Sequence, residues 1–151
     1  MSLQDTNVRP ATATDGPFLL DLVNTQDVKF WSGRNKDIGP VEHAIWFGKA
    51  LSDEWHHKVV IATHDGVRAG YGRLEFVTEA RVSFAVDKAY RGQGIGGYIL
   101  WALEQERAGA PLLAYVHPGN TPSLRAFLSQ GYTLDEMRTE KGVMWQILRK
   151  G

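Results

Sequence analysis

A glycine-rich turn constrains the fold of this chain more than any other feature of its sequence. Residues 86–100 read VDKAYRGQGIGGYIL, and four of the six residues from Gly92 to Gly97 are glycine. An apolar run that predicts a strand precedes this turn, and a helical pattern of apolar residues follows it. Each glycine in a helix lowers its stability by about 1 kcal/mol relative to alanine. Several glycines at a helix start therefore indicate that another group must approach the backbone closely there.

The chemistry of such a turn favours an anion. The first amide N–H groups of a helix have no partner within the helix, and the helix dipole adds positive potential there. Glycine allows positive φ angles and removes the Cβ atoms that would block a close-packed diphosphate. Arg91 precedes the glycines and adds a positive charge. The sequence therefore predicts a phosphate site between a strand and a helix.

Two common phosphate-binding patterns do not fit. Gly92, Gly94 and Gly97 match G-x-G-x-x-G, but a dinucleotide fold requires an acidic residue about 20 positions further on. Here the next predicted strand ends in His117-Pro118, and too little chain remains for a doubly wound sheet. A nucleoside-triphosphatase loop is excluded because the sequence contains no G-K-[ST].

The hydrophobic periodicity predicts one mixed α/β domain over residues 1–151. Strand, helix and strand between Val82 and Val116 should place those two strands parallel. The segment 31–40, WSGRNKDIGP, predicts a loop. We expect strands over 7–12, 58–63, 67–77, 81–86 and 112–117, a C-terminal hairpin over 132–149 that turns near 140–142, and helices from 15 to about 23, over 41–51, after 97 and from 121 to about 131.

Composition narrows the class of protein. Seventeen basic and seventeen acidic residues give a formal net charge of zero, which argues against broad electrostatic binding to nucleic acid or to an anionic membrane. The chain has no cysteine, so it has no thiol nucleophile and no disulfide. His56-His57 has no third ligand at a suitable spacing, so no metal site is expected. The polar N-terminus and the lack of a run of about 20 apolar residues predict a cytoplasmic protein.

Two motifs resemble one known family. Arg91–Gly96 matches the R/Q-x-x-G-x-G/A signature of the GNAT superfamily of N-acetyltransferases. Asn120, Ser123, Phe127 and Gly131-Tyr132 resemble its later N-x-x-S and G-F/Y segment. The resemblance implies an α/β (α+β) fold with a mixed, mostly antiparallel sheet, flanked by helices, whose fourth and fifth strands splay apart.

The resemblance also implies a co-substrate, acetyl-coenzyme A. The backbone amides of the glycine turn would hold its diphosphate, and the strand before the turn would pair with its pantetheine arm. Two residues after the fifth strand would lie beside the pantetheine or adenosine end. The residues implied are Arg91, Gly92, Gln93, Gly94, Ile95, Gly96 and Gly97 in the turn, Phe84, Ala85 and Val86 in the strand, and Asn120 and Ser123.

Family members transfer the acetyl group directly to an amine, and this chain departs from them at two positions. Arg81 stands where many relatives carry a glutamate, and Phe127 stands where many carry a tyrosine that protonates the leaving thiolate. Glu79 lies two residues before Arg81 and would point to the same side of a strand. Glu79 and His117 are the predicted catalytic residues, with Glu75 and water as alternatives for the proton transfer.

The acceptor is predicted from a weaker pattern. Residues 34–47 resemble members that acetylate nucleotide-linked amino sugars, and Trp31, Arg34 and Glu75 are the expected acceptor contacts. We therefore expect a small-molecule amine, with an amino sugar first. A protein N-terminus, a polyamine and a non-catalytic acyl-coenzyme A sensor remain alternatives. A homodimer is common in the family and stays open here.

Overall fold

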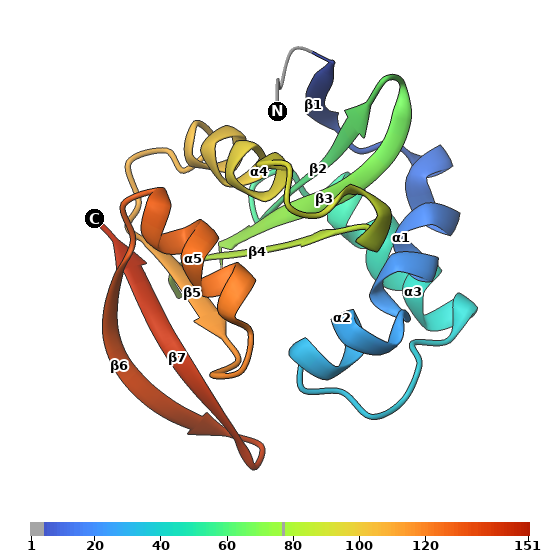
Figure 1. The fold of residues 1–151 in the computed structure, drawn as a ribbon. Helices are drawn as coiled ribbons and strands as arrows, with labels where there is room; N and C mark the ends of the chain where they lie inside the picture. The colour runs from blue at the N-terminus through green and yellow to red at the C-terminus, as the bar shows by residue number, and fades with distance from the viewer. Residues whose placement is uncertain (1–4, 77) are drawn as a thin grey trace.

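The protein is built around one mixed sheet, which the computed structural model describes over residues 5–76 and 78–151 (Figure 1). Its seven strands have the order β1-β2-β3-β4-β5-β7-β6. Neighbouring strands are antiparallel except β4 and β5, which are parallel. The strands are β1 (Thr6–Pro10), β2 (His57–His64), β3 (Val67–Phe76), β4 (Ala80–Val86), β5 (Leu112–Val116), β6 (Thr133–Glu140) and β7 (Val143–Lys150).

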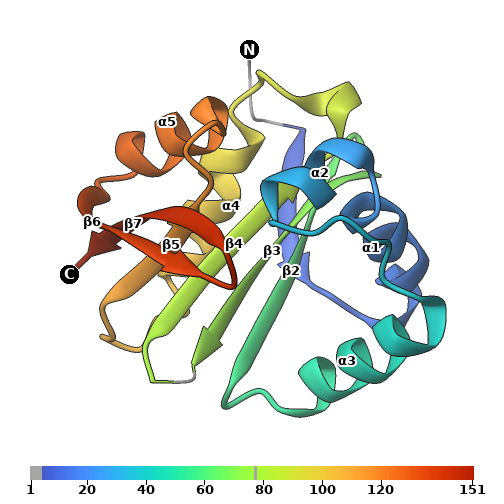
Figure 2. The ribbon, with the colours of Figure 1, turned by 90° about the horizontal axis from the view of Figure 1, so that it is seen from below.

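Helices cover both faces of the sheet (Figures 1 and 2). One face carries α4 (Ile95–Glu104) and α5 (Thr121–Ser129), and the other carries α1 (Gly16–Val23), α2 (Gln26–Trp31) and α3 (Pro40–Ser52). Two short 3-10 helices, η1 (Ala13–Asp15) and η2 (Lys88–Tyr90), precede α1 and the glycine turn. Within the described residues, every helix is too short or too polar to cross a membrane.

Each face of the sheet has its own apolar core. On one face, Ile99 and Leu103 of α4 are fully buried against β3. Gly72 of β3 permits this contact, because a Cβ atom there would lie 2.3 Å from Ile99 Cγ2 and 2.8 Å from Leu103 Cδ1. On the other face, Leu19 of α1 and Phe47 of α3 belong to a second buried cluster. The two cores hold the helices on opposite sides of β3 and β4.

The parallel contact between β4 and β5 is short. Ala80–Val82 of β4 pair with Leu112–Ala114 of β5, although β4 continues to Val86 and β5 to Val116. Beyond Val82 the two strands therefore separate, and the described residues include no other strand that pairs with this edge of β4. This confirms the predicted mixed sheet with splayed fourth and fifth strands.

The element order, the parallel pair and the C-terminal hairpin agree with the expectations from sequence. Helix α2 was not predicted, because six residues are too few to show a helical period. Helix α4 begins at Ile95 rather than after Gly97, so two glycines lie in its first turn. Val77, the predicted end of the third strand, lies outside the described residues.

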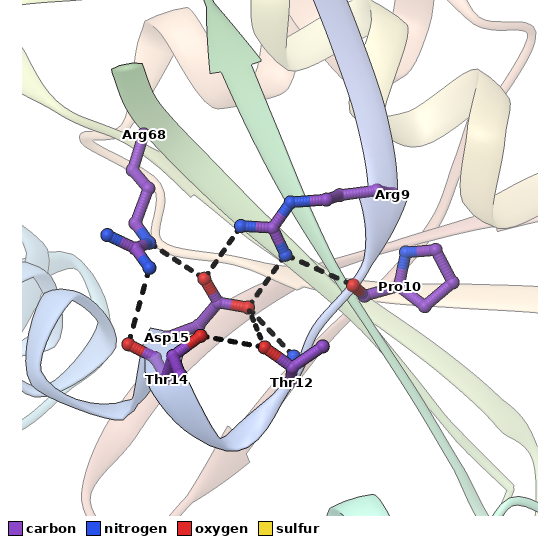
Figure 3. A network of polar contacts seen from close by, with 6 residues as sticks. All are labelled: Arg9, Pro10, Thr12, Thr14, Asp15 and Arg68. Atoms are coloured by element: carbon purple, nitrogen blue, oxygen red, sulfur yellow. Dashed lines mark hydrogen bonds and ion pairs between the residues drawn. The ribbon is translucent and has the colours of Figure 1, made fainter. Parts of the chain in front are cut away.

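A buried carboxylate joins the first strand to the first helix (Figure 3). Asp15 has a fully buried side chain and accepts hydrogen bonds from Arg9 at 2.8 Å, from Arg68 Nε at 2.7 Å and from the Thr12 amide at 2.8 Å. The hydrogen bond from Arg9 is the largest cause that holds the pKa of Asp15 well below its ordinary value. We call these four residues the Asp15 network.

Candidate functional site

A cleft of about 1290 Å³ opens where β4 and β5 separate. It is lined by β3, β4, β5, α5 and the start of α4, with residues of α2 and β7 completing its wall. Most of the predicted site residues line it. They are Trp31, Glu75, Phe84, Ala85, Val86, Arg91, Gly92, Gly94, Ile95, Gly96, Gly97, His117, Asn120 and Ser123. Gln93, Arg34 and Glu79 are outside the lining.

The glycine turn presents unpaired amides to this cleft. Gly94 has a φ of 82° and forms the N-cap of α4, a left-handed conformation that glycine adopts without a Cβ clash. The first backbone bond of the helix runs from the Tyr98 amide to the Gly94 carbonyl at 3.2 Å. Within the described chain, the amides of residues 93–97 meet no protein acceptor. This row of donors at a helix start can hold a phosphate group.

Arg91 is held beside the turn by two contacts. Its Nε donates to the Val86 carbonyl at 2.9 Å, and its guanidinium forms an ion pair with Asp27 of α2. The hydrogen bond from Arg91 is the main cause that lowers the pKa of Asp27. The predicted positive charge is therefore present at the turn, but it is partly neutralised by a carboxylate that sequence reasoning did not pair with it.

The residues predicted to bind the pantetheine arm line the cleft. Phe84 belongs to the stretch of β4 beyond its last pair with β5, and its ring contacts Phe127 at a centroid distance of 5.5 Å. Asn120 is the N-cap of α5, and its Oδ1 accepts from the Ser123 amide at 3.3 Å. Phe127 is buried, so this part of the wall is apolar and carries no hydroxyl.

One face of β3, β4 and β5 carries a row of polar and aromatic side chains. Alternate residues of a strand point to the same face, which places Arg73 and Glu75 of β3 with Tyr71 on the side of α1 and α3. Arg73 Nε lies 2.7 Å from Glu75 Oε1. The Arg81 guanidinium stacks 3.6 Å from the ring centroid of Tyr115 on β5. Glu75 is the only carboxylate among the described residues that line the cleft.

The two predicted catalytic residues are separated in the structure. Glu79 immediately precedes β4, and its carboxylate accepts from Arg149 at 2.6 Å near the surface. His117 follows β5 at the open end of the cleft, and its Nδ1 accepts from the Gly119 amide at 3.1 Å. Because Nδ1 accepts this hydrogen bond, Nε2 carries the proton of the neutral imidazole.

Aromatic side chains join α2 to β5 and β7 at this open end. His117 lies 5.0 Å from Phe30, 5.5 Å from Trp31 and 6.2 Å from Trp145 between ring centroids. We call these four residues the aromatic bridge. Trp31, a predicted acceptor contact, thus lies at the cleft wall. Arg34 instead donates to the Val23 carbonyl at 2.6 Å and supports the loop after α2.

Sequence reasoning missed several cleft residues. Sequence reasoning assigned no function to five residues that line the cleft: Tyr71, Arg73, Arg81, Tyr115 and Trp145. The alternation along Leu112–His117 was a usable signal for Tyr115, because it shares a strand face with His117. No local pattern could have found Trp145, because the hairpin β6–β7 brings it from the far end of the chain.

Comparisons with known proteins agree on fold and family. The model of the acetyltransferase (GNAT) family matches residues 19–132. An aminoglycoside acetyltransferase, AAC(6')-Ib, solved with coenzyme A, superposes with a TM-score of 0.80 at 14% identity over 96% of this chain and 94% of that one. The ribosomal-protein-alanine N-acetyltransferase of Brucella melitensis gives 0.78 at 24% identity over 95% and 98%.

One curated relative shows sequence similarity over a shorter stretch. "Putative phosphinothricin acetyltransferase YwnH" of Bacillus subtilis (strain 168) is 35% identical over 68 residues, which are 41% of this chain and 40% of that protein. The match therefore spans less than half of the relative's length. The family model, in contrast, covers the segment from α1 to the end of α5 and includes the glycine turn. The chain belongs to the acetyltransferase (GNAT) family.

Proposed function

We propose that the protein transfers an acetyl group from acetyl-coenzyme A to a primary amine of a small molecule. One observation carries the proposal: the unpaired amides of residues 94–97 and the unpaired edge of β4 open into the same cleft. The amides suit a diphosphate. The strand edge suits an extended arm with amide groups, which would add to the sheet as a further strand does.

The residues present fit this co-substrate. A Cβ atom at Gly92 would meet nothing within 4 Å, so the turn has open space on its outer side. Arg91 adds positive charge, and Phe84, Ala85 and Val86 supply the strand edge. Asn120 and Ser123 face the cleft from α5. Acetyl-coenzyme A supplies the acetyl group as a thioester, whose C–S bond breaks while the new N–C bond forms.

Glu75 is the best-supported group for removing the proton of the acceptor ammonium. It lines the cleft and lies on β3 opposite Arg81, where β4 is still paired with β5. Arg73 is its ion-pair partner. Glu79 remains a second candidate, but its ion pair with Arg149 holds it outside the cleft lining. His117 is a third candidate, at the open end.

The leaving thiolate needs no protein acid in this proposal. Phe127 stands in the cleft without a hydroxyl, and the hydroxyl of Tyr115 already donates to Glu140 at 3.2 Å and accepts from Arg138. A thiol has an ordinary pKa near 8.5, so a thiolate can leave near neutral pH and take its proton from water. The protein's contribution is then to orient the two reactants and accept the amine proton.

An amino sugar is the finer proposal for the acceptor. Trp31 at the cleft wall supports it, because an aromatic face can pack against a sugar ring. Arg34 gives no support, because its guanidinium is bound to the Val23 carbonyl. The similar proteins are named for an aminoglycoside, a ribosomal protein and phosphinothricin. Membership of the family is therefore compatible with several kinds of amine.

Calorimetry and a thiol assay test the proposal. Acetyl-coenzyme A should bind at micromolar to millimolar concentration, and free thiol should then appear on addition of a suitable primary amine. Thiol release with any amine separates an enzyme from a binding module. If millimolar acetyl-coenzyme A gives no heat of binding, the proposed function is wrong.

A further inference from the structure

A second hollow, of about 220 Å³, adjoins the cleft. Its walls come from α1, the loop after α2, α3 and β3, and it shares Tyr71 and Arg73 with the lining of the cleft. We call it the side cavity. Its other lining residues are Leu19, Val23, Ile38, Glu42, His43 and Trp46. By liquid volume, a space of this size corresponds to about seven water molecules, which is enough for a ring.

The wall formed by the loop after α2 is fixed in position. Asn24 binds the backbone of Ile38 twice, donating to its carbonyl at 2.9 Å and accepting from its amide at 2.8 Å. Arg34 holds the same loop to the end of α1 through the Val23 carbonyl. Burial lowers the pKa of Arg34, as expected for a guanidinium used as a structural support. A wall held by three hydrogen bonds is already in place before a ligand arrives.

The buried charges of the side cavity are already balanced. The Arg73 guanidinium lies 5.1 Å from the ring centroid of Trp46 and is paired with Glu75. His43 is 5% exposed, and burial lowers its pKa, so the imidazole is neutral near pH 7. Its Nε2 has no hydrogen-bond partner among the described residues. Glu42 forms no ion pair there either, but it is exposed at the rim, so the buried part of the surface offers no unpaired charge.

We propose that the side cavity receives an uncharged apolar or aromatic substituent of the acceptor, while the acceptor's amine remains in the cleft beside Glu75. The proposal rests on the proposed acetyltransferase activity and adds a substrate class to it. A polyamine's second ammonium would find no buried carboxylate among the described residues of the cavity. A phosphate group would find only Arg73, whose charge is matched by Glu75.

A series of amines tests the substrate class. Burying a phenyl group should raise kcat/KM for 2-phenylethylamine about 10- to 100-fold above that for ethylamine. The same assay should show no such gain for 1,4-diaminobutane. Equal rates for ethylamine and 2-phenylethylamine, or a preference for the diamine, would overturn the proposal.

Filling the cavity tests its location. Ile38→Trp places a large ring in the half-buried wall, and Ile38→Phe is a smaller version should the first fail to fold. Val41→Trp is the control, because Val41 is 73% exposed on α3 and does not line the cavity. We expect the Ile38 variants to lose the preference for 2-phenylethylamine and to acetylate ethylamine normally. An equal loss for both amines contradicts the assignment.

Binding without chemistry separates this inference from the proposed function. 2-Phenylethanol cannot be acetylated at an amine, and it should give a heat of binding to the wild type and to Val41→Trp but not to Ile38→Trp, without any co-substrate. If it binds in this pattern and no amine is acetylated, the proposed function fails and the side cavity stands. If amines are acetylated and 2-phenylethanol does not bind at millimolar concentration, only the side cavity fails.

Discussion

The Asp15 network and the cleft use the same kinds of polar group in opposite ways. In the Asp15 network, one buried carboxylate is saturated by two arginines and a backbone amide. In the cleft, the amides of residues 94–97 have no acceptor among the described residues, and β4 has an edge without a strand partner. Polar groups that are satisfied internally hold the chain together, and groups left unsatisfied at a hollow surface mark where a ligand binds.

The largest expected effect concerns the Asp15 network. Asp15→Ala leaves Arg9 and Arg68 without their shared partner, and we expect a loss of about 3 kcal/mol in unfolding free energy. This corresponds to a fall in Tm of about 6–12 °C, with unchanged affinity for acetyl-coenzyme A. Asp21→Ala, an exposed change in α1, is the control. A Tm equal to that of the control would show that the network does not stabilise the fold.

The same carboxylate gives a pH dependence with a defined sign. The pKa of Asp15 is lower in the folded protein than the ordinary value near 3.9 in an unfolded chain. Its contribution is therefore complete above that ordinary value and is lost as the pH falls toward the folded pKa. The Tm values of wild type and Asp15→Asn should differ most at neutral pH and should begin to converge only as the pH falls below about 4.

In the cleft, Glu75→Gln should reduce kcat by about 100-fold, because a general base typically contributes 10²–10⁴. The change keeps the size of the side chain, so the affinity for acetyl-coenzyme A should be preserved. Glu79→Gln is the matched variant, and steady-state kinetics with one amine compare the two. Should Glu79→Gln lose the activity instead, proton removal belongs to Glu79.

The glycine turn allows a variant in which stability and binding move in opposite directions. A Cβ atom at Gly97 would come within 3.2 Å of the flexible end of Gln130, at the mouth of the amide row. Gly97→Ala should raise unfolding free energy by up to about 1 kcal/mol and weaken acetyl-coenzyme A about tenfold, the equivalent of one impaired charge-assisted hydrogen bond. Thermal unfolding and calorimetry measure the two effects.

Gly48→Ala is the control for this test. It lies in α3, and an added Cβ atom would meet nothing within 4 Å. We expect a similar gain in stability with unchanged binding. If Gly97→Ala binds acetyl-coenzyme A as tightly as Gly48→Ala does, the turn does not contact the co-substrate.

The smallest expected effect is at the ion pair beside the turn. Asp27→Asn releases Arg91 from a partly exposed carboxylate, and exposed pairs contribute about 0.2–1 kcal/mol. Acetyl-coenzyme A should therefore bind up to about fivefold tighter at low salt, as measured by calorimetry at two ionic strengths. Asp37→Asn is the control, because it breaks an ion pair with Lys29 of α2 away from the turn. This change should leave the affinity for acetyl-coenzyme A unchanged.

The parts of the fold that follow local rules were predictable. The glycine turn, the strand–helix–strand unit around it and the hairpin turn at Lys141-Gly142 carry their signals within a few residues. The side of the cleft that we propose for the co-substrate is built from that unit and from the start of α5. The residues that line it could therefore be named from two motifs.

The side of the cleft that we propose for the acceptor could not be predicted in the same way. Arg34 was expected to contact the acceptor, and only the structure shows that its guanidinium donates to the Val23 carbonyl of α1. Glu79 looked suitable by strand alternation, but Arg149 from the C-terminal strand engages it. Helix α2 is too short to show a period, and the aromatic bridge joins residues from three distant elements. Each of these contacts depends on tertiary packing rather than on spacing along the chain.

The short seam between β4 and β5 has a mechanical consequence. Among the residues that the structure describes, the C-terminal part of the sheet pairs with the N-terminal part at only three positions, Ala80–Val82 with Leu112–Ala114. A ligand that binds between β4 and β5 and contacts both strands would hold the two parts of the sheet together. We therefore expect amide hydrogen exchange in β5 and β7 to slow on ligand binding more than exchange in β2 and β3, which are joined along almost their whole length.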